Sequence, residues 1–177
     1  MVRCFIGFLI PENLKNKIIS IQNGLKELPM SCKFVEPENL HISFSFLGEV
    51  DENRIEEMGS SLDDIVKNYE KIPCRILGLK PIPSRSYIRV LALDVMDEHN
   101  NLREIGNVIR KEMGGDVKPP HLTLCRVRRI DDKIKVLEGI DRYNELSIDI
   151  VIDRIQLIKS ELRGDGPIYK VIHESIF

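Results

Sequence analysis

Apolar residues recur along this chain with two periodicities: every second residue in some segments and every third or fourth residue in others. Alternation predicts strands over residues 2–10, from 41, over 73–80, over 87–95, from 121, and in two closing segments at 145–162 and 166–177. The helical period predicts helices over residues 12–28, 52–70, 97–115 and 131–139. Strands and helices are therefore mixed along the whole sequence.

The order of these elements repeats once. A strand–helix–strand–helix–strand unit runs through residues 1–82 and starts again in 83–177, with the turn-rich stretch KPIPSRS as the link. Strands mixed with helices without strict βαβ alternation are typical of an α+β fold. We expect one bilobal domain over 1–177, with two pseudo-symmetric lobes of antiparallel sheet, helices outside and a cleft between the lobes. The final strands are free to exchange between the lobes.

The strand in NLHISFSFLGE carries a histidine and a hydroxyl two residues apart. Strict alternation places His41 and Ser43 on one face of this strand. The same alternation places Phe44 and Phe46 on the opposite face, where we expect them in the core beneath the helices. The strand is thus predicted to have one polar, reactive face and one apolar face.

The stretch PPHLTLCRVRR in the second half repeats this pattern with His121 and Thr123. Alternation adds Cys125 to the histidine face and places Arg126 on the opposite face, unless the strand bulges after Thr123. One histidine at the start of a strand is most simply structural. Two equivalent polar faces are harder to explain in that way, because burying them without partners is costly. The pair predicts a cleft lined by two imidazoles and two hydroxyls.

Such a cleft suits phosphodiester chemistry. One group must take a proton from the nucleophile while another gives a proton to the leaving oxygen, and histidine serves both roles near neutral pH. Hydroxyls on the same face can hydrogen-bond the non-bridging oxygens and stabilise the charge that builds there. This scheme requires no metal. The two other histidines, His99 and His173, are expected to be solvated and structural, respectively.

Composition and charge exclude several classes of protein. The chain has 177 residues and a formal net charge of −2, so bulk electrostatics do not favour a protein that coats nucleic acid. Cations nevertheless gather between Lys118 and Lys135, which fits either a solvated edge strand or a local phosphate pocket. The 4 cysteines show no CxxC spacing, which argues against a zinc or redox site. No apolar run approaches the ~20 residues of a membrane span and no signal peptide is evident, so we expect a cytoplasmic protein.

The motifs HISF and HLTLCR resemble the twin H-x-(S/T)-x motifs of the 2H phosphoesterase superfamily. More narrowly, the chain resembles its RNA 2′,3′-cyclic phosphodiesterases, long called 2′-5′ RNA ligases, from RCFIGFLIPENLKNKI to the closing LIKSELRGDGPIYKVI. The resemblance implies metal-independent hydrolysis of RNA 2′,3′-cyclic phosphate ends to 2′-phosphates, and reversible 2′-5′ RNA ligation in some members. It implies RNA ends or cyclic nucleotides as substrates and no cofactor. We expect a monomer without membrane association.

Carried over by position, the resemblance implies catalytic roles for His41 and His121, with Ser43, Thr123 and Arg126 binding the substrate phosphate. His121 is expected to be the base for the attacking water and His41 the acid for the departing 3′ oxygen, although the symmetry of the motifs permits the swap. Two alternatives stay open. A non-catalytic RNA-binding module needs exposed aromatic residues, which an aromatic content of 6% without tryptophan supplies poorly. A metal hydrolase lacks support, because neither HExxH nor closely spaced carboxylates occur.

Overall fold

The computed structural model describes residues 1–164 and 166–177, so position 165 of the closing LIKSELRGDGPIYKVI stretch lies outside the description. The helices are α1 (Glu12–Lys26), η1 (Pro37–Asn39), η2 (Glu52–Arg54), α2 (Ile55–Val66), α3 (Asn101–Met113) and α4 (Lys133–Asp141). The strands are β1 (Val2–Leu9), β2 (Met30–Phe34), β3 (His41–Val50), β4 (Ile72–Pro83), β5 (Ile88–Met96), β6 (His121–Ile130), β7 (Ser147–Ile152), β8 (Arg154–Leu162) and β9 (Pro167–Ile176). Each element expected from the sequence is present, with ends that differ by a few residues.

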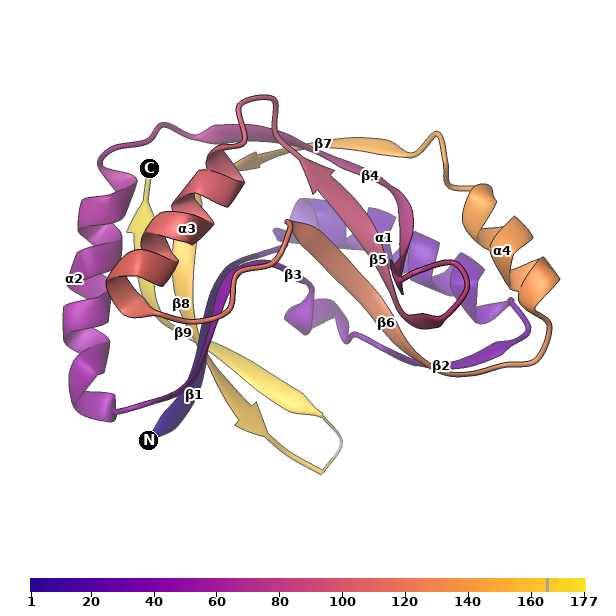
Figure 1. Cartoon of the computed structure of the whole chain (residues 1–177), viewed down its shortest axis with the longest axis horizontal. Coiled ribbons are helices and arrows are strands. Elements are labelled where there is room, and N and C mark those ends of the chain that lie inside the picture. Colours follow the sequence, from indigo (N-terminus) through magenta and orange to yellow (C-terminus); the bar gives the residue numbers. More distant parts are fainter. Residues whose placement is uncertain (165) are drawn as a thin grey trace.

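The strands form one antiparallel sheet in the order β7-β4-β5-β6-β3-β1-β8-β9, and β2 also pairs with β6. The sheet divides into two lobes (Figure 1). One lobe contains β3, β1, β8 and β9, against which α2 and α3 pack. The other contains β2 and β4 to β7, with α1 and α4 as its helices. This arrangement confirms the predicted α+β fold of two antiparallel lobes with helices outside.

Each lobe draws on both halves of the chain. β4 comes from the first half but pairs with β5, whereas β8 and β9 come from the second half and extend the sheet beyond β1. Helix α1 belongs to the lobe that contains β6. It is bonded there through the Gln22 side-chain amide, which donates to the carbonyls of Val35 and Leu124. Neither half of the sequence therefore completes a lobe by itself.

The two lobes meet at Ile42 in β3 and Leu122 in β6, which we call the seam pair. Within the described residues this is the one register pair that joins these two strands. Both side chains are fully buried, at 0% exposure. Each residue of the seam pair directly follows the histidine that begins its strand. The open face beside the seam pair is consequently the place where the two motifs meet.

The helices pack onto the outer face through apolar stripes at helical spacing. The buried apolar residues of α1 are Leu14, Ile18, Ile21 and Leu25, and those of α3 are Leu102, Ile105 and Ile109. Helix α2 is tied to β9 because His173 Nε2 and Ser175 Oγ both donate to the Asp63 carboxylate, at 2.9 and 2.6 Å. The structural role predicted for His173 is thus confirmed. No described helix is long and apolar enough to cross a membrane.

Strand β2 was not predicted from the sequence. Its five residues, MSCKF, are too few and too mixed in burial to give a clear alternation. They form a strand because β6 offers them an edge, with Lys33 paired to Arg126 and Phe34 paired to Cys125. This pairing sets a second cation beside Arg126.

Candidate active site

Strand β3 contains a β-bulge just after its first hydroxyl residue. Successive residues of β1 pair with Ser43 and Ser45, so Phe44 is left without a partner of its own. A bulge reverses the faces of the residues that follow it. Phe46 is consequently 42% exposed and lines the cleft, so its predicted place in the core is wrong. Phe44, 4% exposed, lies in the core as predicted.

Strand β6 contains a bulge at the equivalent place. Successive residues of β5 pair with Thr123 and Cys125, leaving Leu124 unpaired on that side. Arg126, assigned to the far face by strict alternation, therefore turns into the cleft. Cys125, expected on the histidine face, is instead fully buried. Its hydrogen bond with Cys32 and its burial raise the pKa of the Cys125 thiol, so this cysteine is no nucleophile.

The seam pair sets the geometry of the two motifs. His41 and Ser43 flank Ile42 in β3, and His121 and Thr123 flank Leu122 in β6. Because the two strands run antiparallel at this pair, all four side chains line the same cleft. The four side chains form two half-sites related by an approximate two-fold axis through the seam pair.

Each imidazole is oriented by the backbone carbonyl two residues before it. His41 Nδ1 donates to the Asn39 carbonyl at 2.6 Å, and His121 Nδ1 donates to the Pro119 carbonyl at 2.7 Å. Because a carbonyl only accepts, these contacts assign the Nδ1 proton in both rings. Nε2 is then the ring nitrogen without a proton in the neutral imidazole, and it can accept a proton from a ligand. The two turns before the histidines thus present the rings in the same way.

Aromatic rings enclose His41. The centroid of Phe5 lies 4.8 Å from that of His41, and the Tyr169 ring stands edge-on at 5.2 Å. Burial lowers the pKa of His41, with a smaller lowering from His121; the Asn39 carbonyl opposes both. Burial thus favours the neutral form of His41 in the free protein. His41 and His121 are both partly exposed, and both line the cleft.

The cleft has a volume of about 400 Å³. It brings together the site residues predicted from the sequence, namely His41, Ser43, His121, Thr123 and Arg126. The sequence patterns missed Phe5, Phe46, Lys33 and Tyr169, which also line it. Tyr169 belongs to the β8–β9 hairpin, the projecting yellow ribbon in Figure 1, and Lys33 to β2. Their approach to the histidines depends on strand pairing across more than one element, which no local motif reveals.

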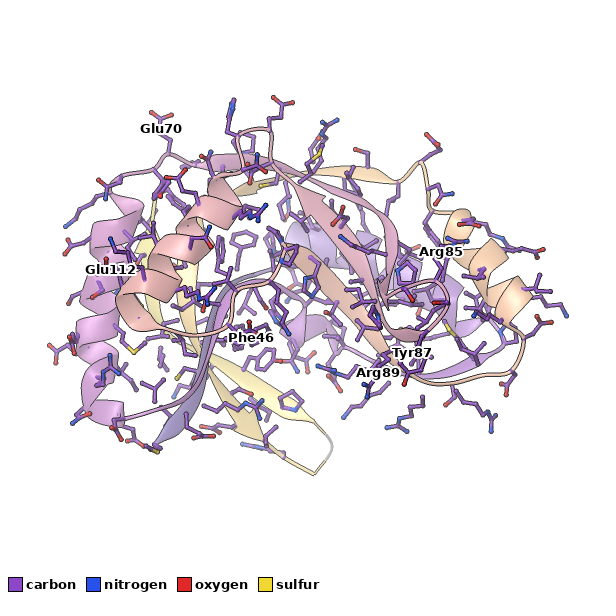
Figure 2. All side chains as sticks on the ribbon, in the orientation of Figure 1. Phe46, Glu70, Arg85, Tyr87, Arg89 and Glu112 are labelled. Atoms are coloured by element: carbon purple, nitrogen blue, oxygen red, sulfur yellow. The ribbon has the colours of Figure 1, made fainter. Side chains whose placement is uncertain are left out.

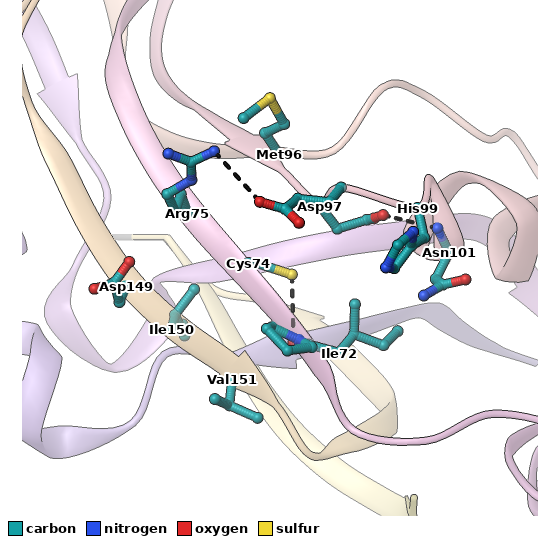
Figure 3. Close-up of a pocket in the computed structure, with 12 residues that line it drawn as sticks. Ile72, Cys74, Arg75, Met96, Asp97, His99, Asn101, Asp149, Ile150 and Val151 are labelled. Carbon is teal, nitrogen blue, oxygen red and sulfur yellow. Dashed lines mark hydrogen bonds and ion pairs between the residues drawn. The ribbon is translucent and has the colours of Figure 1, made fainter.

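A second cavity of about 310 Å³ lies at the joined ends of β4, β5 and β7 (Figure 3). Its lining includes the carboxylates of Asp97, Glu98 and Asp149, and Asp97 already accepts two backbone N–H groups at the start of α3. His99 is exposed here, as predicted. Three carboxylates make this cavity a poor place for a phosphate. Among the described residues, no group of three or more His, Cys, Asp or Glu is placed to hold a metal ion.

Known proteins match the chain along nearly its whole length. The model of the LigT-like phosphoesterase family matches residues 8–92 and 93–169. The RNA 2′,3′-cyclic phosphodiesterase of Methanocaldococcus jannaschii is 38% identical, over 98% of this chain and 99% of that protein. The protein of the same name from Methanothermobacter thermautotrophicus is 31% identical, over 95% of each.

Solved structures share the fold. The protein TT0787 of Thermus thermophilus superimposes with a TM-score of 0.78 at 18% identity, over 98% of this chain and 97% of the other. Escherichia coli LigT complexed with 3′-AMP gives a TM-score of 0.68 at 18% identity, over 99% and 97%. At these identities the likeness concerns the backbone arrangement alone.

Proposed function

Because the chain belongs to the LigT-like phosphoesterase family, we propose that it hydrolyses RNA 2′,3′-cyclic phosphate ends to 2′-phosphates, with His41 and His121 as acid and base. The observation that carries this proposal is the pair of half-sites that face one cleft across the seam pair. The names of the relatives from M. jannaschii and M. thermautotrophicus support the same substrate.

The reaction uses groups that line the cleft. Water attacks phosphorus, one imidazole Nε2 takes its proton, and the bond from phosphorus to the ribose O3′ breaks. The other imidazole protonates O3′, which leaves the phosphate on O2′ and frees the 3′-hydroxyl. The hydroxyls of Ser43 and Thr123 donate to the non-bridging oxygens, and Arg126 offsets the charge that builds on them. These groups complete the reaction without a metal.

The two histidines differ in environment, which bears on their roles. We propose His121 as the base and His41 as the acid. Burial lowers the pKa of His41 in the free protein, so it must gain its proton when substrate binds. An anionic phosphate between the two rings favours this, because a nearby negative charge raises the pKa of an imidazole. A substrate with a highly activated leaving group needs no acid, so it restores turnover in His41→Ala but not in His121→Ala if the roles are assigned correctly.

Turnover of a 2′,3′-cyclic nucleotide in the presence of a chelator tests the proposal. His41→Ala and His121→Ala should each lose about 10²–10⁴-fold in kcat, the usual contribution of one general acid or base. His99→Ala, an exposed histidine outside the cleft, is the matched control and should keep wild-type turnover. Circular dichroism confirms that each variant is folded. Full activity in either cleft variant, or dependence on a metal, contradicts the proposal.

Product analysis separates hydrolysis from joining. With water as the nucleophile, an RNA ending in a 2′,3′-cyclic phosphate yields a 2′-phosphate. With a 5′-hydroxyl as the nucleophile, the same proton transfers form a 2′-5′ linkage, so the assay includes a second RNA with that end. A non-catalytic RNA-binding module would bind both strands and form neither product.

A further inference from the structure

Basic side chains continue along β6 beyond the cleft, toward the end of this strand. A second bulge leaves Arg128 without a β2 partner, because Cys32 pairs with Val127 and Ser31 pairs with Arg129. Arg126, Arg128 and Arg129 are all exposed.

These arginines differ in their partners. Arg129 is held by Asp131 at 2.8 Å, whereas Arg126 and Arg128 have no ion pair among the described residues. Residues two apart on a strand lie ~7 Å apart. Arg126 and Arg128 thus form a short line of available charge that starts inside the cleft.

Strand β5 adds an aromatic ring and a third cation beside this line. Val90 pairs with Arg126, which sets Arg89 next to the end of β6. The Arg89 guanidinium lies 6.0 Å from the ring centre of Tyr87, and Tyr87 is 62% exposed. Figure 2 shows Tyr87 and Arg89 together at this end of the molecule. Arg85 nearby is occupied by Asp141 at 2.8 Å, whereas Arg89 has no ion pair among the described residues.

The β1 side of the cleft has mixed charge. Arg3 and Lys159 lie there with Glu49, Glu52 and Glu161, and Lys159 is paired with Glu161 at 3.0 Å. The end of β6 has an excess of positive charge and therefore attracts an anionic strand more strongly.

We infer that the RNA strand preceding the cyclic phosphate leaves the cleft over an exit strip formed by Tyr87, Arg89 and Arg128. Beyond the cyclic phosphate held at Arg126, its next backbone phosphate contacts Arg128, and an unpaired base stacks on Tyr87 beside Arg89. The partner is single-stranded RNA, because a base stacked in a duplex offers no free face to Tyr87. This inference rests on the proposed function, since it places the strand's end at the two histidines.

The test compares a 2′,3′-cyclic mononucleotide with a short single-stranded RNA that has the same terminal nucleotide. The measured quantity is the ratio of kcat/KM for RNA to kcat/KM for the mononucleotide. Tyr87→Leu should lower this ratio about tenfold, since the unpaired base loses the aromatic ring on which it stacks. Arg89→Ala and Arg128→Ala should lower it several-fold. Arg103→Ala on α3, exposed and without an ion pair among the described residues, is the control for bulk charge.

A measurement of RNA binding tests the same inference without requiring turnover. The affinity of RNA ending in a 2′-phosphate is measured by fluorescence anisotropy at several salt concentrations. Each lost phosphate contact should reduce the slope of log K against log salt by ~0.7. Arg128→Ala should show this change and Arg103→Ala should not.

Failure of the inference and failure of the proposed function differ in outcome. An unchanged RNA-to-mononucleotide ratio in all three strip variants, or an equal fall in Arg103→Ala, overturns the exit strip. A wild-type protein that turns over neither substrate contradicts the proposed function, and the anisotropy arm then still decides whether the strip binds RNA.

Discussion

Asn39 connects the β8–β9 hairpin to the turn that orients His41. Its side chain is 4% exposed, and its amide nitrogen donates to the Pro167 carbonyl at 2.8 Å. Its own backbone carbonyl accepts from His41 Nδ1. Pro167 begins β9, which carries Tyr169 against the His41 ring. Removing the Asn39 amide should therefore disturb both the stability of the fold and the burial of His41.

The size of the effect follows from one hydrogen bond. Asn39→Ala leaves the Pro167 carbonyl without its partner, which costs about 1–3 kcal/mol. An unfolding entropy of about 2.1 cal/mol/K per residue over 177 residues is about 0.37 kcal/mol/K, so Tm should fall by about 3–8 °C. Once the hairpin loosens, water reaches His41, and its lowered pKa should rise toward the ordinary value.

Two measurements check this chain of reasoning. Thermal unfolding gives Tm, and the pH titration of the His41 imidazole signals by NMR gives the pKa. Asn23→Ala is the matched control, because the one side-chain hydrogen bond of Asn23 among the described residues is an exposed one with Lys26 within α1, at 3.0 Å. An Asn39→Ala protein as stable as Asn23→Ala would show that the hydrogen bond from Asn39 to Pro167 does not stabilise the fold. A large loss of stability with an unchanged His41 pKa would show that this hydrogen bond does not affect the candidate active site.

Three further changes test other parts of the structure. Gly7→Ala would set a Cβ 2.7 Å from the Ile42 carbonyl, so it should lower the free energy of unfolding by about 1–3 kcal/mol and reduce turnover. Gly164→Ala is the control and should change neither quantity, because its Cβ would meet nothing within 4 Å. Because the pKa of His41 is lowered from 6.5, the unfolded chain binds this proton first, and the free energy of unfolding should decline as pH falls below 6.5. Denaturant titrations that show the same decline in His41→Gln would contradict that origin. Cys125→Ala should keep its kcat, and the Cys125 thiol should react with thiol reagents only on unfolding; rapid labelling of the native protein would disprove its burial.

The shared face of each histidine and its hydroxyl residue could be predicted from the sequence, because it depends on local order alone. A strand start fixes which face His41 and Ser43 share, and the same holds for His121 and Thr123. The repeated order of elements also suffices to predict two antiparallel lobes. Each of these inferences uses neighbouring residues and needs no knowledge of the partner strand.

The positions after the hydroxyls could not be predicted in this way. A bulge depends on how a strand pairs with its neighbour. The apolar–polar alternation within β3 or β6 alone does not reveal it. Phe46 and Arg126 therefore appeared to face the core side, whereas both line the cleft. Tyr169 reaches His41 only because β9 lies beyond β1 and β8 in the sheet. Such contacts between distant segments have no local signal.

We propose that His41 and His121 bind one phosphate between them. The most direct test is a ¹⁵N NMR titration of both imidazoles with a 2′-nucleotide, the product of the proposed reaction. One equivalent should shift the Nε2 signals of both rings with a single dissociation constant and should raise the pKa of His41. A nucleotide that shifts only one ring, or shifts the two rings at different concentrations, would show that they do not share a phosphate.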